Sequence, residues 1–379
     1  MLLEWIGEKV MRLISIDVLK EGMVLARTIW NEAGHPLLKK DVVINERIIK
    51  RLQQLNMHYI YIDDKISEGI EVQETVPTVI RNKAISTIKD SFQSIDGLNP
   101  VNASYVLDQQ SKAIVSIVDE LLLAVRGNDE ILTILTDAYL FDEYLYQHSF
   151  QVTLYSIAIA KELGYSAEDL RLIGIGALLH DIGKLMVPKD ILTKPARLSY
   201  EEFETMKQHA RYGFDLLRNL HSISLIVAHC AFQHHERIDG SGYPRGLVDF
   251  EIHPFAKIIG VADVFDAVTT SRVYREKMLP SQGLAILEAG AGTIYEARIV
   301  NALKRSVVHY PNGVILKLSD GRRGIVSRQN TLNPALPWIR IFEEQNQLLA
   351  ATYEINLVDD SAVIIESVEV DYVVPLKIE

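Results

Sequence analysis

The chain has 379 residues, a formal net charge of −11, and 48% hydrophobic against 23% charged residues, the composition of a globular protein with two or three domains. The acidic balance and the lack of a dense lysine and arginine stripe argue against a nucleic-acid polymer as partner, and the longest apolar runs, such as residues 121–125, are too short to span a bilayer. We expect a cytoplasmic protein, because the N-terminus lacks a secretory signal and the single cysteine, Cys230, excludes an internal disulfide framework.

Residues 1–66 predict a small mixed α/β domain. Apolar and β-branched composition, turn residues and helical spacing of apolar residues predict a strand, a turn, a helix and a second strand, at residues 23–29, 31–34, 43–55 and 59–62. Residues 67–78 are polar and end near a proline, which favours a linker. We therefore expect residues 67–129 to hold a linker and leading helices.

Residues 130–312 predict a helical domain. An apolar stripe at residues 113–122 already indicates a core-packing helix before it. A long helix is expected from Phe141 to Leu163, ended by Gly164. Ser166, with Asp169 three residues later, resembles a capping box that starts the next helix. That helix, residues 170–179, is apolar almost all round, which is typical of a buried helix.

Residues 313–379 predict a small β-rich C-terminal domain. Asp320-Gly321 is a hairpin signal between two alternating segments, residues 314–319 and 324–327. Further strand-like runs lie at residues 338–342, 362–365 and 372–374. The expected fold class is therefore multidomain and predominantly α, with a central all-helical bundle, a small α/β N-terminal domain and a small β-rich C-terminal domain.

The segment 234–244, His-His-Glu-Arg-Ile-Asp-Gly-Ser-Gly-Tyr-Pro, carries the most information about function. Adjacent side chains on a helix diverge by roughly 100°. His234 and His235 can therefore reach a common metal only where the backbone is held unusually, such as at a helix end. The Asp-Gly-Ser-Gly turn that follows supplies chemistry for that.

Other histidines and aspartates lie in apolar helical surroundings. His180-Asp181 ends the buried helix, and Lys184 follows one turn later; His148 lies on a core stripe, and Asp263 is an acid in an apolar helix. Burying such groups is costly unless something compensates their charge. Imidazole and carboxylate ligands suit transition metals, and the set exceeds the needs of one ion. It predicts a two-metal site with a bridging carboxylate, of the kind that performs in-line displacement at phosphorus.

His180-Asp181-Ile182-Gly183-Lys184 resembles the signature of the HD phosphohydrolase superfamily. Together with residues 234–244 and the downstream segment 262–275, it makes the chain similar to the HD-GYP family of phosphodiesterases, which act on the bacterial second messenger cyclic di-GMP. The resemblance covers roughly residues 130–311 and implies that the central helical domain, residues 130–312, is an HD-type bundle. The N-terminal domain is similar, more weakly, to a small module that often precedes HD-GYP domains.

The resemblance also implies a ligand set. One metal is expected on four residues: His148, His180, Asp181 and Asp263. The second is expected on Asp181, as the bridge, and three histidines: His209, His234 and His235. The glutamate that holds a third metal in some members is replaced by Tyr144, so two divalent ions are expected, with iron the first choice and manganese the second.

The implied reaction is hydrolysis of cyclic di-GMP to linear pGpG, or further to GMP, by a hydroxide that bridges the two metals. Asp181 and Lys184 are the candidate catalytic residues, and Lys184 would also contact the phosphate. Arg272 and Arg275 are candidates for phosphate contacts because arginine offers bidentate donors, with surface salt bridges as the alternative. Tyr243 either packs against a guanine or shapes the turn.

Two alternatives stay open. Another HD-type phosphohydrolase is disfavoured by the complete Gly-Tyr-Pro segment. A catalytically weak or inactive cyclic di-GMP receptor that signals through partner proteins is disfavoured by the complete two-metal ligand set. The flanking domains are expected to regulate or dimerise the enzyme, so a homodimer and signalling partners are both compatible with the sequence.

Overall fold

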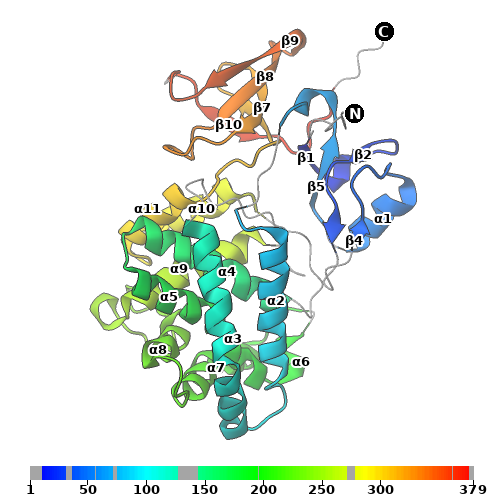
Figure 1. The fold of residues 1–379 in the computed structure, drawn as a ribbon. Coiled ribbons are helices and arrows are strands. Elements are labelled where there is room, and N and C mark those ends of the chain that lie inside the picture. Colours follow the sequence, from blue (N-terminus) through cyan, green and yellow to red (C-terminus); the bar gives the residue numbers. More distant parts are fainter. Residues whose placement is uncertain are drawn as a thin grey trace, which may run out of the picture. The chain divides into compact units, whose positions relative to one another are not determined.

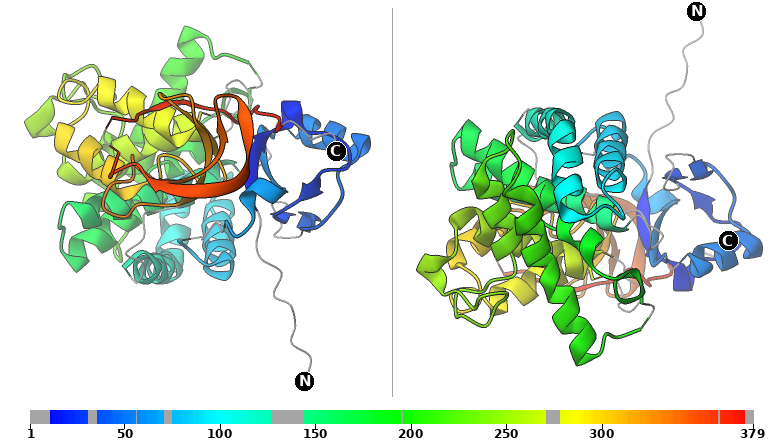
Figure 2. Two further views of the ribbon diagram at one scale, coloured as in Figure 1. Left: turned by 90° about the horizontal axis from the view of Figure 1, so that it is seen from above. Right: turned by 90° about the horizontal axis from the view of Figure 1, so that it is seen from below.

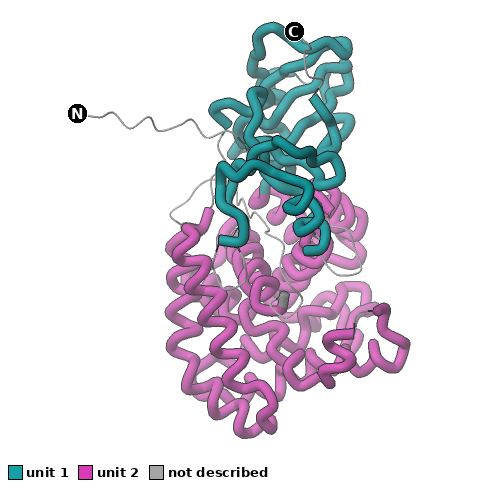
Figure 3. The backbone as a smooth tube through the Cα atoms, turned by 90° about the vertical axis from the view of Figure 1, so that its right-hand side faces the viewer, with its two compact units in different colours: residues 1–73, 135–139, 308–379 teal, residues 74–134, 140–307 magenta. Residues whose placement is uncertain are grey.

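A computed structural model of the chain describes residues 11–30, 36–55, 57–70, 75–126, 144–194, 196–270, 278–360 and 362–374. The described residues form two compact units (Figure 3). Unit 1 is built mainly from residues 1–73 and 308–379, and unit 2 mainly from residues 74–134 and 140–307. Unit 1 contains the β-sheets and unit 2 is helical.

Unit 2 contains the helical bundle (Figure 1). Its α-helices are α2 Thr78–Gln93, α3 Pro100–Arg126, α4 Tyr144–Glu162, α5 Ala167–Leu179, α6 Lys189–Leu192, α7 Tyr200–Leu217, α8 Leu225–Gln233, α9 Pro254–Thr269, α10 Pro280–Ala289 and α11 Ala297–Ser306. Two short 3-10 helices, η4 Ile182–Met186 and η5 Asp249–Glu251, lie between them. Within the described residues, no helix has the length and apolar character needed to cross a membrane.

The centre of unit 2 follows the local signals in the sequence. Gly164, with a φ of 76°, follows the end of α4, and the Ser166 side chain accepts a hydrogen bond from the Asp169 amide to start α5. Both predicted helix boundaries are thus confirmed. Residues 173–179 of α5 are all buried, which confirms that this helix packs on all sides against the core. Cys230 is also buried in that core, as expected of a structural thiol.

The described residues of unit 1 form three sheets, one α-helix and short 3-10 helices. Its N-terminal part has β1 Arg12–Ser15, η1 Ile16–Val18, β2 Val24–Leu25, β3 Ile29–Trp30, β4 Pro36–Leu38, α1 Glu46–Gln54, β5 Tyr59–Asp63 and η2 Lys65–Ser67. The order of the three-stranded antiparallel sheet is β1-β5-β2, and β3 pairs with β4. The predicted helix and the strand after it are confirmed, whereas β1 was not predicted.

The C-terminal part of unit 1 is a five-stranded antiparallel sheet in the order β10-β6-β7-β8-β9, and it is strongly curved (Figure 2). Its strands are β6 Ile315–Leu318, β7 Arg323–Arg328, β8 Trp338–Glu344, β9 Gln347–Asn356 and β10 Ile365–Val368. The predicted hairpin is confirmed: β6 pairs with β7, and Gly321 has a φ of 87°. That left-handed conformation favours glycine because it has no Cβ.

Two strand predictions near the C-terminus were wrong, one in its position and one altogether. The run at residues 362–365 becomes a strand only from Ile365, in β10. Residues 372–374 form no strand. The Tyr372 ring instead packs against the Phe342 ring. The backbone carbonyl of Tyr372 accepts a hydrogen bond from Arg12 Nη1 at 3.0 Å. The apolar composition of this segment therefore reflects side-chain packing and not a ladder of backbone hydrogen bonds.

The two ends of the chain share one core within unit 1. Leu13 and Tyr61 pack in the same apolar cluster as Val314 and Leu316. The backbone of β1 is bonded to the C-terminal part as well, since the Leu13 amide donates to the Gly313 carbonyl at 2.9 Å. A Cβ on Gly313 would lie 2.3 Å from the Met11 carbonyl oxygen, so only glycine permits this approach. Separate terminal domains at residues 1–66 and 313–379 stay a prediction.

Candidate metal centre

Seven predicted site residues lie together in unit 2, and each comes from a helix or a helix end. His148, His209 and Asp263 lie on α4, α7 and α9, and His180 and His234 are the C-terminal caps of α5 and α8. Asp181 and His235 directly follow these caps. The adjacent His234 and His235 rings have centroids 4.0 Å apart, so the end of α8 directs both to one place.

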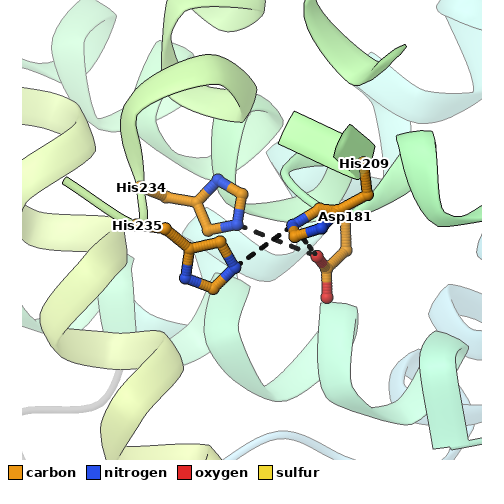
Figure 4. A group of neighbouring side chains, drawn as sticks. All are labelled: Asp181, His209, His234 and His235. Carbon is orange, nitrogen blue, oxygen red and sulfur yellow. Dashed lines mark hydrogen bonds and ion pairs between the residues drawn. The ribbon is translucent and has the colours of Figure 1, made fainter. Parts of the chain in front are cut away.

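The seven residues form two groups whose potential ligand atoms lie within 4.8 Å of one another. The first group is Asp181, His209, His234 and His235 (Figure 4). The second group is His148, His180 and Asp263. Asp181 falls in the first group only, whereas the sequence resemblance implies it in both ligand sets; the assignment of these residues to two metals stays a prediction.

Asp181 lies between the two groups and directs one oxygen to each. Its Oδ2 lies 3.3 Å from Nε2 of His148 and 3.3 Å from Nε2 of His180. Its Oδ1 lies 3.4 Å from Nε2 of His209 and 3.8 Å from Nε2 of His234. The carboxylate is 1% exposed. This arrangement suits a carboxylate that bridges two cations.

Backbone hydrogen bonds fix the imidazoles in one tautomer. Nδ1 of His180, His209 and His234 lies 2.6, 2.7 and 2.9 Å from the carbonyl oxygen three residues earlier in each case. A carbonyl oxygen can only accept, so Nδ1 carries the hydrogen and Nε2 presents its lone pair to Asp181. Metal-binding histidines in proteins are commonly oriented this way.

The centre contains polar atoms that protein groups alone do not satisfy. Among the described residues, the buried atoms Asp181 Oδ1 and His234 Nε2 have no hydrogen-bond partner. Nε2 of His235 lies 3.1 Å from Nε2 of His209, and Nε2 of His180 lies 3.2 Å from Nε2 of His148. Buried polar atoms are normally paired, and facing lone pairs need a proton or cation between them. The donor set therefore fits a divalent metal centre.

Burial keeps three of the histidines neutral and therefore able to bind a metal. Burial lowers the pKa of His209 to about 4 and holds the pKa values of His234 and His235 well below the usual range. For Asp181, burial by itself raises the pKa, but the charge of Lys184 holds that pKa well below its ordinary value. At neutral pH the centre thus offers imidazole lone pairs and an ionised bridging carboxylate.

Of the residues predicted to bind substrate, the structure describes Lys184 and Tyr243. The Lys184 ammonium hydrogen-bonds to Asp181 Oδ2. The Tyr243 ring stacks on His235, with centroids 4.6 Å apart and an interplanar angle of 30°. Arg272, Arg275 and the side chain of Tyr144 lie outside the described residues, so their roles stay predictions.

The loop that carries Tyr243 is bonded to the buried carboxylate of Glu236. Oε1 of Glu236 accepts from the Arg245 amide at 2.8 Å, and its Oε2 accepts from the Leu247 amide at 2.9 Å. Glu236 is 5% exposed. It therefore holds the loop in place through two backbone amides.

Asp266 is a site residue to which sequence reasoning gave no role. It is fully buried on α9, where its Oδ2 accepts from Nδ1 of His148 at 2.7 Å and its Oδ1 accepts from the Thr270 hydroxyl at 2.9 Å. It orients His148 as the backbone carbonyls orient His180, His209 and His234. The sequence did contain a sign of this role: Asp266 is a second acidic residue in an apolar helix. It lies three residues after Asp263 and therefore on the same helix face.

Replacing Asp266 by asparagine should weaken metal binding about tenfold, because a neutral amide makes the His148 ring less basic and holds it less firmly. Titration of metal-free protein with Mn²⁺, followed by calorimetry, measures this affinity. The surface variant Asp119→Asn, which removes the carboxylate from an exposed ion pair with Arg171, is the control. Equal affinities for both variants and the wild type would contradict a role for Asp266 in orienting the ligand.

A helical bundle with buried histidines and aspartates at its centre fits a divalent metal centre of the kind that hydrolases use. Residues 138–299 match a family model described as HD domain and contain both the His-Asp and the Gly-Tyr-Pro segments. Together with the curated relatives, this match supports a phosphodiesterase of the HD-GYP type within the HD superfamily.

Curated relatives agree with this assignment. The chain is 27% identical over 354 residues to a cyclic di-GMP phosphodiesterase of Pseudomonas aeruginosa, covering 87% of this chain and 84% of that protein. It is 44% identical over 148 residues to a cyclic di-GMP phosphodiesterase response regulator of Xanthomonas campestris, covering 39% of each. A 3'3'-cGAMP-specific phosphodiesterase of Vibrio cholerae is 38% identical over 169 residues, which is 36% of its length.

Among solved structures, an HDG"Y"P protein from Bdellovibrio bacteriovorus is similar with a TM-score of 0.44 and 18% identity. The similarity covers 77% of this chain and 98% of that one.

Proposed function

We propose that this phosphodiesterase hydrolyses cyclic di-GMP to linear pGpG at a centre of two divalent metal ions. One observation carries the proposal: Asp181 directs its two carboxylate oxygens to two separate groups of imidazoles. A single ion would need only one of these groups. The proposed ligands are His148, His180 and Asp263 for one ion, His209, His234 and His235 for the other, and Asp181 for both.

The proposed reaction needs positive charge where the phosphoryl oxygens develop negative charge. When bound, the two ions supply Lewis acidity, which polarises the phosphodiester and makes a water molecule acidic. Lys184 adds an ammonium directly beside Asp181, and its flexible stem can place that charge near the phosphate. Burial lowers the pKa of His209 and His234, so these two histidines can hold an ion without adding charge of their own.

Cyclic di-GMP is the substrate that the relatives favour, since the Pseudomonas and Xanthomonas proteins are both described by it. The Vibrio relative extends the class to another cyclic dinucleotide. We propose iron as the metal, with manganese as the alternative, in a cytoplasmic enzyme. The terminal segments that form unit 1 are proposed to regulate the enzyme or to mediate dimerisation.

Removing the metal should abolish hydrolysis. Restoring the metal should recover most of the activity, because six of the seven proposed ligands are buried in the bundle, which holds them in place. Protein purified without oxygen is analysed for metal content and incubated with cyclic di-GMP, and the products are separated by chromatography. We expect about two ions per chain and release of pGpG. Tight nucleotide binding without turnover, in fully loaded protein, would instead identify a receptor.

A further inference from the structure

An aromatic side chain of α7 lies on the surface next to the metal centre. Phe203 is 45% exposed, and its ring centroid lies 6.4 Å from that of Tyr243 at an angle of 79°. Tyr243 in turn stacks on His235 and lies 6.3 Å from the His209 ring. A continuous series of rings thus leads from one group of proposed ligands to the exposed face of Phe203.

Lys207 lies between the two outer rings. Its Nζ is 5.5 Å from the centroid of Phe203 and 5.7 Å from that of Tyr243, within the range of cation–π attraction. Lys207 also forms an ion pair with Glu204 at 2.6 Å, and the lysine side chain is 22% exposed. The ammonium is therefore held at one place on the surface, one turn along α7 from Phe203.

A cyclic dinucleotide makes demands that the metal centre alone does not meet. Only one of its phosphates can react at a time, so the second needs a cation elsewhere. Its two purine bases are large and flat, and protein sites that bind single-stranded nucleotides stack such bases on aromatic side chains. The rings of Phe203 and Tyr243 are nearly perpendicular, so one base can lie flat on only one of them.

We infer that Phe203 and Lys207 form the outer part of the substrate site, where a purine base stacks on the exposed face of Phe203 and Lys207 pairs with the phosphate that does not react. This inference rests on the proposed function and adds to it a binding surface on α7. Phe203 and Lys207 are binding residues and not catalytic ones, because they contact parts of the substrate that do not change during hydrolysis.

Phe203→Ala tests the base contact in the full-length, metal-loaded protein. We expect KM and the dissociation constant for cyclic di-GMP to rise about 5- to 150-fold, the range that ~1–3 kcal/mol of stacking energy represents. The value of kcat should stay within about threefold, because the contact is made equally before and during the reaction. Phe203→Trp should restore binding, since it restores a stacking face.

Two controls separate this effect from damage to the centre. Tyr200→Ala removes an aromatic ring that is 75% exposed at the start of the same helix, and it should leave both constants unchanged. Methyl 4-nitrophenyl phosphate, a phosphodiester without a nucleobase, should be cleaved equally by the wild type and by Phe203→Ala. An equal loss on both substrates would mean that Phe203 supports the centre itself, which would overturn the inference.

Lys207→Gln tests the second contact. Removing one cation–phosphate pair should weaken binding of cyclic di-GMP and make the affinity depend less on salt concentration. Lys207→Arg should keep the affinity and the salt dependence of the wild type. Unchanged affinity in both Phe203→Ala and Lys207→Gln, in protein that hydrolyses cyclic di-GMP, refutes the inference and leaves the proposed function standing. A wild type that cleaves the small ester but neither binds nor cleaves cyclic di-GMP refutes both.

Discussion

Asp181→Asn should lower hydrolysis of cyclic di-GMP about a thousandfold, which corresponds to roughly 4 kcal/mol of transition-state stabilisation. The reason is that one carboxylate serves both groups of histidines, with Oδ2 facing His148 and His180 and Oδ1 facing His209. An amide has nearly the same shape but no charge, and its nitrogen cannot bind a cation. The variant should therefore also lose metal, which elemental analysis measures independently of turnover.

The result is informative only if the variant folds. Circular dichroism of Asp181→Asn should match that of the wild type, because the substitution keeps the volume of a fully buried side chain. Asp119→Asn again serves as the matched control, since exposed ion pairs of this kind contribute about 0–1 kcal/mol. A folded Asp181→Asn enzyme with wild-type turnover would rule out the shared-carboxylate centre.

Gly183→Ala should destabilise the protein by about 3 kcal/mol and separate two parts of the centre. A Cβ at this position would lie 2.0 Å from the carbonyl oxygen of His209 and 2.4 Å from the amide nitrogen of Gly213. Both are backbone atoms of α7, so the clash is relieved only if η4 and α7 move apart. Such a movement carries Asp181 away from His209.

Gly213→Ala is the control for this contact from its other side. Its Cβ would lie 3.3 Å from the Ala231 Cβ and 3.5 Å from the Gly183 amide nitrogen, which is tight but without overlap. Alanine also has a helix propensity about 1 kcal/mol better than glycine, which offsets part of the strain. Thermal unfolding should therefore show a large drop for Gly183→Ala and a small change for Gly213→Ala; equal melting temperatures would contradict the argument.

Much of the helical unit could be predicted because its signals are local. Ser166 and Gly164 act through hydrogen bonds and backbone conformation within a few residues, and the apolar surface of α5 permits only a buried position. The strand β9 was missed for the opposite reason. Its residues are mostly exposed, so its sequence has no alternation that a core would impose, and it forms through pairing with β8.

The candidate site likewise contains residues that short sequence motifs reveal and residues that only the folded structure reveals. His180, Asp181, His234 and His235 lie in short motifs whose order along the chain is distinctive. Asp266 and Phe203 acquire their importance only from contacts with His148 and Tyr243, which are far from them in sequence. A single sequence contains no record of such contacts. The shared core of β1 and the C-terminal sheet was unpredictable for the same reason.

The joining of the two chain ends also sets an order of folding during synthesis. Leu13 leaves the ribosome about 300 residues before Gly313, the residue to which its amide is bonded. At about 5–20 residues per second, β1 waits roughly 15–60 s for that partner. The helical unit is complete on the nascent chain before the C-terminal strands exist. The strand β1 can thus pair with β5 early in synthesis, but it reaches its C-terminal neighbours only near the end.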